Sequence, residues 1–146
     1  MIISAALTDA PLDISAHLDA VASPHAGATA VFVGTVRDND PEAGGTVERL
    51  DYSAHPDAER LLGQIAATCD APDVRIAVSH RIGFLAVGET AIVAAVSSRH
   101  RDAAFTISRE VVERVKERLP VWKRQVEADG TAEWIGLGSL APGASA

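Results

Sequence analysis

The sequence predicts an α+β fold in a single domain, in which helices cover a largely antiparallel sheet. Segments with strand patterns and three segments with helical periodicity follow each other in the order β-α-β-β-α-β-β-α-β-β. The chain has 146 residues, of which 47% are hydrophobic and 23% are charged. It is therefore long and apolar enough to bury a core of its own.

Two strands and one helix are expected at the start of the chain. Residues 1–7 predict a strand, after which Asp9 and Pro11 start a helix that ends near Pro24. Residues 27–38 are rich in Val and Thr, which predicts a buried strand.

A loop, a strand and a second helix are expected next. Residues 39–46 are dense in turn formers and predict the loop, and residues 47–54 predict the strand. Pro56 suits the first position of a helix over 56–70, because its fixed φ already matches that of a helix.

A long β-hairpin is expected in the middle of the chain. Residues 73–80 and 90–98 predict its two strands. The connection between them contains Gly83 and Gly88, which suit a turn or a short excursion at the tip of the hairpin.

The last helix is expected over residues 101–119, and Pro120 ends it. Its apolar stripe is formed by Ala104, Ser108, Val111, Val115 and Leu119, at spacings of three and four residues. Residues 121–137 predict a strand, a turn and a return strand. The domain is therefore expected to span residues 1–137, and the small and polar residues 138–146 predict a flexible tail with no role in activity.

Charge and cysteine content exclude several classes of protein. The 13 basic and 20 acidic residues give a net charge of -7, which argues against general binding of nucleic acid. Cys69 is the only cysteine, so no internal disulfide forms. The opening sequence lacks the pattern of a secretory signal, and no apolar stretch reaches the roughly 18 residues of a membrane span. We therefore expect a cytoplasmic protein.

Standard catalytic and cofactor motifs are missing from the sequence. The glycines form neither GxxxxGK[ST] nor GxGxxG, and no serine lies in a GxSxG elbow. The five histidines show no HxxxH or HExxH spacing and have no cysteine pair beside them. We therefore expect no metal and no resident cofactor.

Cationic residues at the ends of the expected elements are the candidate binding groups. Arg37 follows the first long strand, and the pair His100–Arg101 lies where the last helix starts. Lys116 and Lys123 flank the end of that helix and are the only lysines, whereas the other eleven basic residues are arginines. A cluster of this kind suits an anionic ligand.

Simpler interpretations of these residues remain open on sequence grounds. Lysines at the end of a helix can complement its dipole and extend into water, and His100 can occupy a cap region without any chemistry. His80 and Arg81 flank the hairpin tip, where an arginine commonly ties loop carbonyls together, so we interpret this pair as structural.

Five ordered segments resemble the family of large, catalytic subunits of molybdopterin synthase. They are VFVGTVRD, SHRIGFLAVGE, SSRHRDAAF, VKERLPVWKRQ and DGTAEWI, and together they extend from about Gly27 to Ile135. The resemblance implies an α/β hammerhead fold. It also implies that the chain converts a cyclic pyranopterin monophosphate into molybdopterin, by installing two dithiolene sulfurs and opening the cyclic phosphate.

The resemblance also implies partners and site residues. The sulfur comes from a small ubiquitin-like subunit whose C-terminal Gly-Gly thiocarboxylate enters the pocket, and two large subunits form the central dimer of a heterotetramer. The substrate-binding residues of the family fall on Thr35, Val36, Arg37, His100, Arg101, Lys116, Lys123, Arg124 and Gln125. Lys116 and Lys123 are the expected catalytic residues.

The two lysines are expected to have different roles. An amine can transfer a proton or act as a nucleophile where its neutral form is accessible, which a guanidinium cannot do near neutral pH. Our hypothesis is that Lys116 is the principal acid/base or nucleophile and that Lys123 binds phosphate and the tail of the partner.

Departures from the family pattern leave two other functions open. Tyr52-Ser53-Ala54-His55 and Ala58 stand where relatives usually have a Glu-x-Tyr pattern and a methionine, and no basic residue follows Trp134 closely. A non-catalytic homologue that only binds the partner, or a lysine-dependent enzyme acting on another small anion, would share the cationic cluster.

Overall fold

The computed structural model describes residues 1–38, 47–127 and 132–136. In these ranges the helices and strands follow the predicted order, with one additional strand. The elements are β1 (Ile2–Thr8), α1 (Ile14–Val21), β2 (Ala28–Thr35), β3 (Val47–Ala54), α2 (Ala58–Ala67), β4 (Arg75–Arg81), β5 (Gly83–Ala86), β6 (Thr90–Ser98), α3 (Arg101–Arg118), β7 (Val121–Glu127) and β8 (Ala132–Gly136). The predicted tail at 138–146 and the loop at 39–46 lie outside the described residues.

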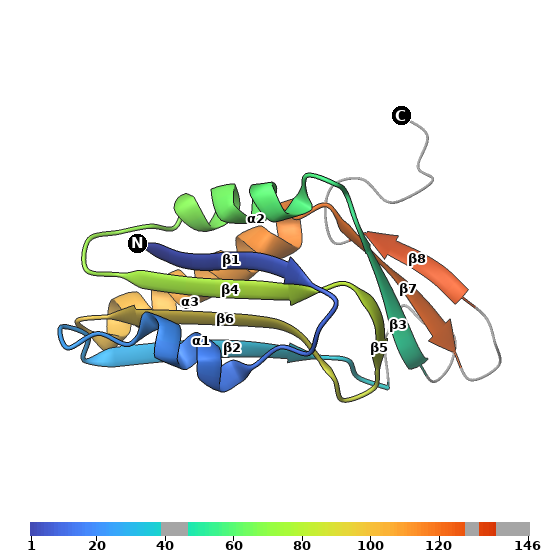
Figure 1. The fold of residues 1–146 in the computed structure, drawn as a ribbon, viewed down its shortest axis with the longest axis horizontal. Helices are drawn as coiled ribbons and strands as arrows, with labels where there is room; N and C mark the ends of the chain where they lie inside the picture. Colours follow the sequence, from blue (N-terminus) through green and yellow to red (C-terminus); the bar gives the residue numbers. More distant parts are fainter. Residues whose placement is uncertain (39–46, 128–131, 137–146) are drawn as a thin grey trace.

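The strands divide into two four-stranded sheets (Figure 1). The order is β1-β4-β6-β2 in the larger sheet and β5-β3-β7-β8 in the smaller one. Every pairing is antiparallel except that of β1 with β4. The α+β fold class is confirmed, and the division into two sheets is a feature that the sequence did not predict.

The additional strand β5 lies in the connection of the long hairpin. β4 and β6 pair as predicted, but β5 between them pairs with β3, with Leu85 opposite Leu50. Gly83 and Gly88 have φ values of 88° and 90°, in the left-handed region that other residues rarely adopt. The two glycines let the chain leave the larger sheet and return to it, so one hairpin joins the two sheets.

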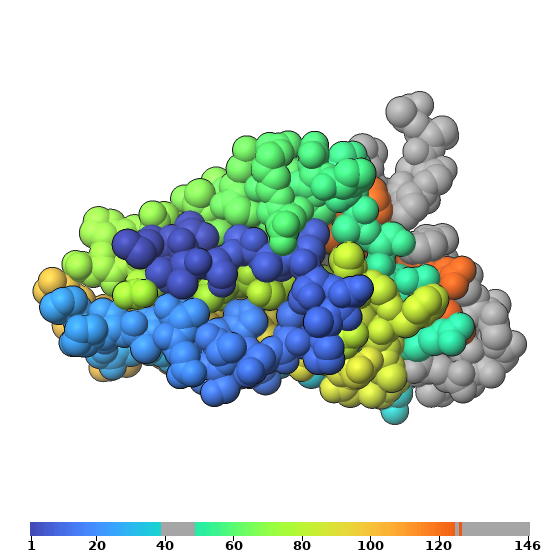
Figure 2. All heavy atoms as spheres, in the orientation of Figure 1, coloured from blue at the N-terminus to red at the C-terminus, as the bar shows by residue number. Residues whose placement is uncertain are grey.

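The central strands β4 and β6 are buried on both faces. α2 and α3 pack on one side, where Ile76 and Val78 of β4 join the main core, and α1 packs on the other, where Ala77 meets Val21. Figure 2 shows α1 lying over the outer face of this sheet, beside the edge strand β1. Burial on both faces explains why these strands read as almost continuous apolar runs.

The helix α3 matches its predicted stripe. The five residues of that stripe are all buried, with exposures of 9% or less, and His100 occupies the N-cap position. α1 begins later than the sequence suggested, at Ile14, because the side chain of Asp13 caps it by accepting a hydrogen bond from the amide of Ala16 at 3.0 Å. Within the described part of the chain, no helix is long and apolar enough to cross a membrane.

Three elements end at the same side of the larger sheet. Figure 1 shows β2, β4 and α3 running toward the smaller sheet, which lies across their C-terminal ends. The backbone after β2 is fixed there, because the amide of Val36 donates to the carbonyl of Glu89 at 3.0 Å and the amide of Gly88 donates to the carbonyl of Val36 at 2.8 Å. This convergence positions the residues of the candidate site.

Replacing Gly88 by alanine is expected to destabilise the fold by about 1–2 kcal/mol, because a Cβ is strained at a positive φ. Gly63 provides the matched control, since it lies in α2 with no atom within 4 Å of an added Cβ. There, alanine is expected to stabilise the protein by about 0.5–1 kcal/mol. Urea unfolding of both variants measures the difference, and equal stabilities would contradict the role assigned to Gly88.

Candidate active site

A cavity of about 330 Å³ lies where the ends of β2, β4 and α3 meet the smaller sheet. Its wall is built by residues from β2, β3, β4, β6, α3 and β7. A volume of this size is typical of sites for small ligands.

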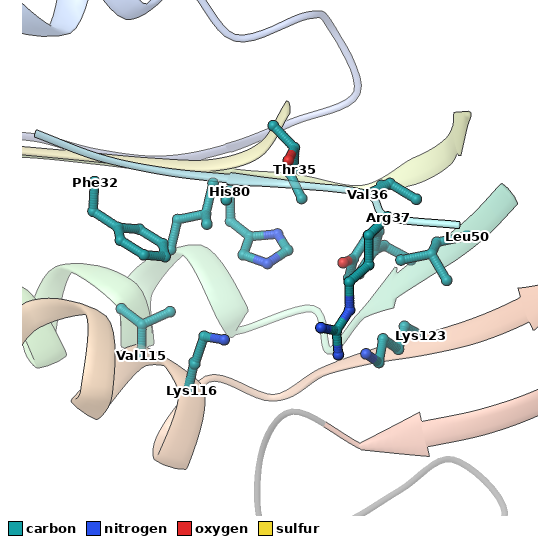
Figure 3. Close-up of a pocket in the computed structure, with 13 residues that line it drawn as sticks. Phe32, Thr35, Val36, Arg37, Leu50, His80, Val115, Lys116 and Lys123 are labelled. Carbon is teal, nitrogen blue, oxygen red and sulfur yellow. The ribbon is translucent and has the colours of Figure 1, made fainter. Parts of the chain in front are cut away.

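Three cationic side chains line the cavity and come from three different parts of the fold. Arg37 follows β2, Lys116 lies in the last turn of α3, and Lys123 lies on β7. Figure 3 shows their nitrogens directed into the same space. No acidic residue is among the described residues of the wall, and the predicted Thr35 and Val36 belong to it. The cavity therefore has the charge that an anionic ligand requires.

The register of β7 separates Lys123 from Arg124. Lys123 lies opposite Tyr52 of β3, and both line the cavity. Arg124 points to the other face of the strand, where it forms an ion pair with Asp51 at 3.6 Å. Arg124 was predicted as a site residue and lies outside the cavity wall, whereas the side chain of Gln125 lies outside the described residues.

The junction between α3 and β7 is anchored on both sides. Leu119 is fully buried, and its amide donates to the carbonyl of Val115 at 2.9 Å. The carbonyl of Pro120 accepts a hydrogen bond from the amide of His55 at 3.0 Å. Lys116 precedes this junction and is exposed, and Lys123 follows it and is half-buried. Because the backbone between them is anchored, both amines are held near the cavity.

His100 and Arg101 lie away from the cavity of their own chain. Both are exposed at the start of α3, and His100 makes no side-chain capping bond. Sixteen residues of helix separate His100 from Lys116, which corresponds to about 24 Å along the axis. A single small anion cannot contact both ends of this helix. The predicted role of the pair in binding substrate stays a prediction.

His80 lines the cavity although the sequence suggested only a structural role for it. Its side chain is 3% exposed, and Nδ1 donates a hydrogen bond of 2.6 Å to the carbonyl of Arg81. Burial lowers the pKa of His80 to about 4, and the positive charge of Lys116 adds to this effect, against the hydrogen bond to Arg81. The signal that could have found His80 is strand alternation, because it shares a face with the buried Ile76 and Val78.

The neighbouring Arg81 has the structural role that the sequence predicts. It donates a hydrogen bond to the carbonyl of Asp9 at 3.2 Å and forms an ion pair with Glu89 at 3.4 Å. Among residues 1–38, 47–127 and 132–136, no three His, Cys, Asp or Glu side chains converge as a metal site would require.

The fold places a cationic cavity with room for a small anionic ligand at the junction of two sheets. The model of the MoaE protein family matches residues 7–118. Molybdopterin synthase catalytic subunit 1 of Mycobacterium tuberculosis is 42% identical over 133 residues, which are 89% of this chain and 88% of that protein. The corresponding subunit of Bacillus subtilis is 38% identical over 133 residues, which are 89% of this chain and 83% of that protein.

Solved structures agree with the sequence relatives. The crystal structure of molybdopterin synthase from Staphylococcus aureus has a TM-score of 0.82 at 32% identity and covers 89% of this chain and 95% of that one. A complex of subunits 1 and 2 of molybdopterin-converting factor from Helicobacter pylori shares the fold, with a TM-score of 0.68 at 19% identity over 92% of this chain and 87% of that one. The chain belongs to the MoaE protein family, which confirms the resemblance seen in the sequence.

The lowered pKa of His80 predicts how stability depends on pH. Between pH 6.5 and about 4 the unfolded chain binds a proton at His80 that the folded chain does not, so the free energy of unfolding falls as the pH drops through this window. The full loss is up to about 3 kcal/mol.

Chemical denaturation at several pH values measures this loss, with the His80→Gln variant as control, because it lacks the titrating group. Asp70 also has a lowered pKa, through its hydrogen bond with the N-terminal amine, but its contribution is lost only below its ordinary value of 3.8. Equal slopes for the two proteins between pH 6.5 and 4 would show that His80 does not titrate as stated.

Proposed function

We propose that this chain is a catalytic subunit of molybdopterin synthase, which transfers sulfur from the C-terminal thiocarboxylate of a small subunit to a cyclic pyranopterin monophosphate. The observation that carries the proposal is the cavity in which Arg37, Lys116 and Lys123 meet without an acidic residue in the described wall. Both reactants are anionic, and the relatives that share the fold are named as catalytic subunits of this enzyme.

The chemistry matches the types of cation present. Negative charge on the cyclic phosphate and on the acyl intermediate of sulfur transfer is stabilised by donors that are already in place. The guanidinium of Arg37 can bind two phosphate oxygens at once, whereas each lysine provides a compact charge. Each sulfur transfer leaves a carboxylate on the small subunit, and two transfers complete the dithiolene.

Lys116 is proposed as the principal acid/base or nucleophile. Its charge acts on the buried imidazole of His80, so its amine is close to the inner wall of the cavity even though the residue is largely exposed. Lys123, which lies on the smaller sheet opposite Tyr52, is proposed to bind phosphate and the incoming tail of the small subunit.

The proposed partner is a small ubiquitin-like subunit with a C-terminal Gly-Gly thiocarboxylate. The complex of subunits 1 and 2 of molybdopterin-converting factor from Helicobacter pylori, which shares the fold, supports an assembly with a second subunit. A cytoplasmic location is proposed with this partner, and the single cysteine, Cys69, is buried in the fold.

A homodimer at the centre of a heterotetramer would explain the position of His100 and Arg101. Within one chain these residues lie about 24 Å from Lys116 along α3. In a symmetric dimer, the start of α3 in one copy can approach the cavity of the other. We propose that the pair completes the anion site of the neighbouring copy.

One reconstitution separates the possible functions. The purified chain is mixed with a thiocarboxylated small subunit and the cyclic precursor, and molybdopterin is assayed. Formation of product supports the proposed enzyme. Binding of the small subunit without product would indicate a non-catalytic homologue, and neither binding nor product would indicate an enzyme for another anion.

Lys116→Ala is expected to lower the rate of dithiolene formation by about 100-fold or more, and Lys116→Arg by nearly as much, because a guanidinium cannot transfer the proton. Arg118→Ala is the matched control, since Arg118 lies in the same last turn of α3 but does not line the cavity. Single-turnover rates measure the effect. A near-normal rate for Lys116→Arg would show that charge alone suffices.

Sharing of sites between copies is tested by mixing two inactive variants. Lys116→Ala and Arg101→Ala chains are co-expressed so that random dimers form. If Arg101 serves the neighbouring cavity, half of the dimers contain one intact site, and activity recovers to about one quarter of the wild-type value. If Arg101 acts on its own chain, the mixture stays as inactive as the separate variants.

A further inference from the structure

His80 occupies the inner wall of the cavity that Arg37, Lys116 and Lys123 also line. On β4 it follows Ile76 and Val78 on the face that packs toward α2 and α3, and it is 3% exposed. Figure 3 shows its ring facing the space into which Arg37 and Lys116 point. A polar side chain that is almost fully buried and turned toward a cavity needs a hydrogen-bonding reason to be there.

The hydrogen bond of Nδ1 fixes the tautomer of His80. The carbonyl of Arg81 can only accept, so the 2.6 Å contact requires the proton on Nδ1. That carbonyl is held in place, because Arg81 is itself tied to Asp9 and Glu89. Nε2 therefore carries a lone pair, which can accept a hydrogen bond.

The surroundings of His80 keep the imidazole neutral and oriented. The ring of Tyr52 meets it edge to face, with centroids 5.1 Å apart and an interplanar angle of 76°. Burial lowers the pKa of His80 to about 4 and raises that of Tyr52 to about 12, so both are neutral near pH 7. The charged groups that face the cavity are Arg37, Lys116 and Lys123, and a cation cannot favour an imidazolium.

The cationic side chains of the cavity wall donate hydrogen bonds, whereas His80 can accept one. The arginine and the two lysines are donors only, which suits phosphate and thiocarboxylate oxygens. Among the described residues of the wall, the hydroxyls of Thr35 and Tyr52 can donate or accept, and Nε2 of His80 can only accept. A ligand that matches such a site carries an anionic group and a hydrogen-bond donor such as an N–H.

We propose that Nε2 of His80 accepts a hydrogen bond from a ring N–H of the cyclic pyranopterin, and thereby orients the heterocycle while Arg37, Lys116 and Lys123 bind its phosphate. This proposal rests on the proposed function and adds a substrate-binding residue to it. The role is that of an acceptor for the heterocycle, distinct from the proton transfer assigned to Lys116.

Two amide variants test the contributions of Nδ1 and Nε2 of His80 separately. In His80→Asn the amide reaches the position of Nδ1 and keeps the bond to Arg81, but nothing replaces Nε2. In His80→Gln the longer side chain places its oxygen near the position of Nε2. His17→Asn is the matched control, because His17 lies on the other face of the sheet, where its Nε2 contacts Ser79 at 2.7 Å.

Calorimetry of the cyclic precursor with each variant, without the small subunit, measures binding alone. His80→Asn is expected to raise the Kd about tenfold, which corresponds to one lost hydrogen bond, and His80→Gln is expected to recover most of this loss. His17→Asn is expected to bind like the wild type. If His80→Asn binds the precursor with wild-type affinity, the proposal is overturned. A lower turnover of this variant at unchanged Kd would also overturn it, because His80 would then act on Lys116 and not on binding.

A measurement on the unmodified protein covers the case in which the buried variants fail to fold. In ¹⁵N-histidine spectra, the Nε2 resonance of His80 is expected to shift upfield when the precursor binds, because its lone pair accepts a hydrogen bond. Binding that leaves this resonance unmoved sinks the role of His80 and leaves the proposed function standing. Absence of any binding of precursor to the wild type would overturn both.

Discussion

Burial of β4 and β6 on both faces is the constraint on which the rest of the structure depends. Because their side chains are apolar on either side, α1 must cover one face and α2 with α3 the other. α3 therefore lies along the sheet and ends where β2 and β4 end. Groups that are up to 86 residues apart in the sequence, from Arg37 to Lys123, meet there because layers of similar length end together.

The distribution of charge in the molecule favours an anion at this end of the larger sheet, where the cavity lies. The chain as a whole carries a net charge of -7, yet the described wall of the cavity contains cations and no acid. The net charge repels an anion, whereas the three cations of this concave region attract it, and the apolar parts of the wall concentrate their field. The same contrast would allow the phosphate binding proposed above without a general affinity for nucleic acid.

The sequence predicted the local features well and the long-range ones poorly. The stripe of α3 and the β4–β6 hairpin depend on spacing within one segment, and both are confirmed. The pairing of β1 with β4 and the division into two sheets depend on contacts between distant segments, which periodicity does not encode.

The difference between local features and long-range contacts also explains which site residues the sequence predicted. Lys116 and Lys123 lie on either side of one helix end, so their convergence could be predicted from seven residues of sequence. The family resemblance placed Arg124 with them, and strand alternation turns its side chain toward Asp51, outside the described cavity wall. His80 was interpreted as a tip residue, because its burial arises only when β3, β4 and α3 are brought together.

The anchored junction at Leu119 and Pro120 has a consequence for how the site adapts. The backbone between the two lysines is short and is held to α3 on one side and to His55 on the other. The distance between the Cα atoms of the two lysines is therefore fixed. The distance between their amines changes only by rotation of the methylene stems. In the reaction proposed above, such a site would follow the cyclic phosphate as it opens, without a change in the backbone.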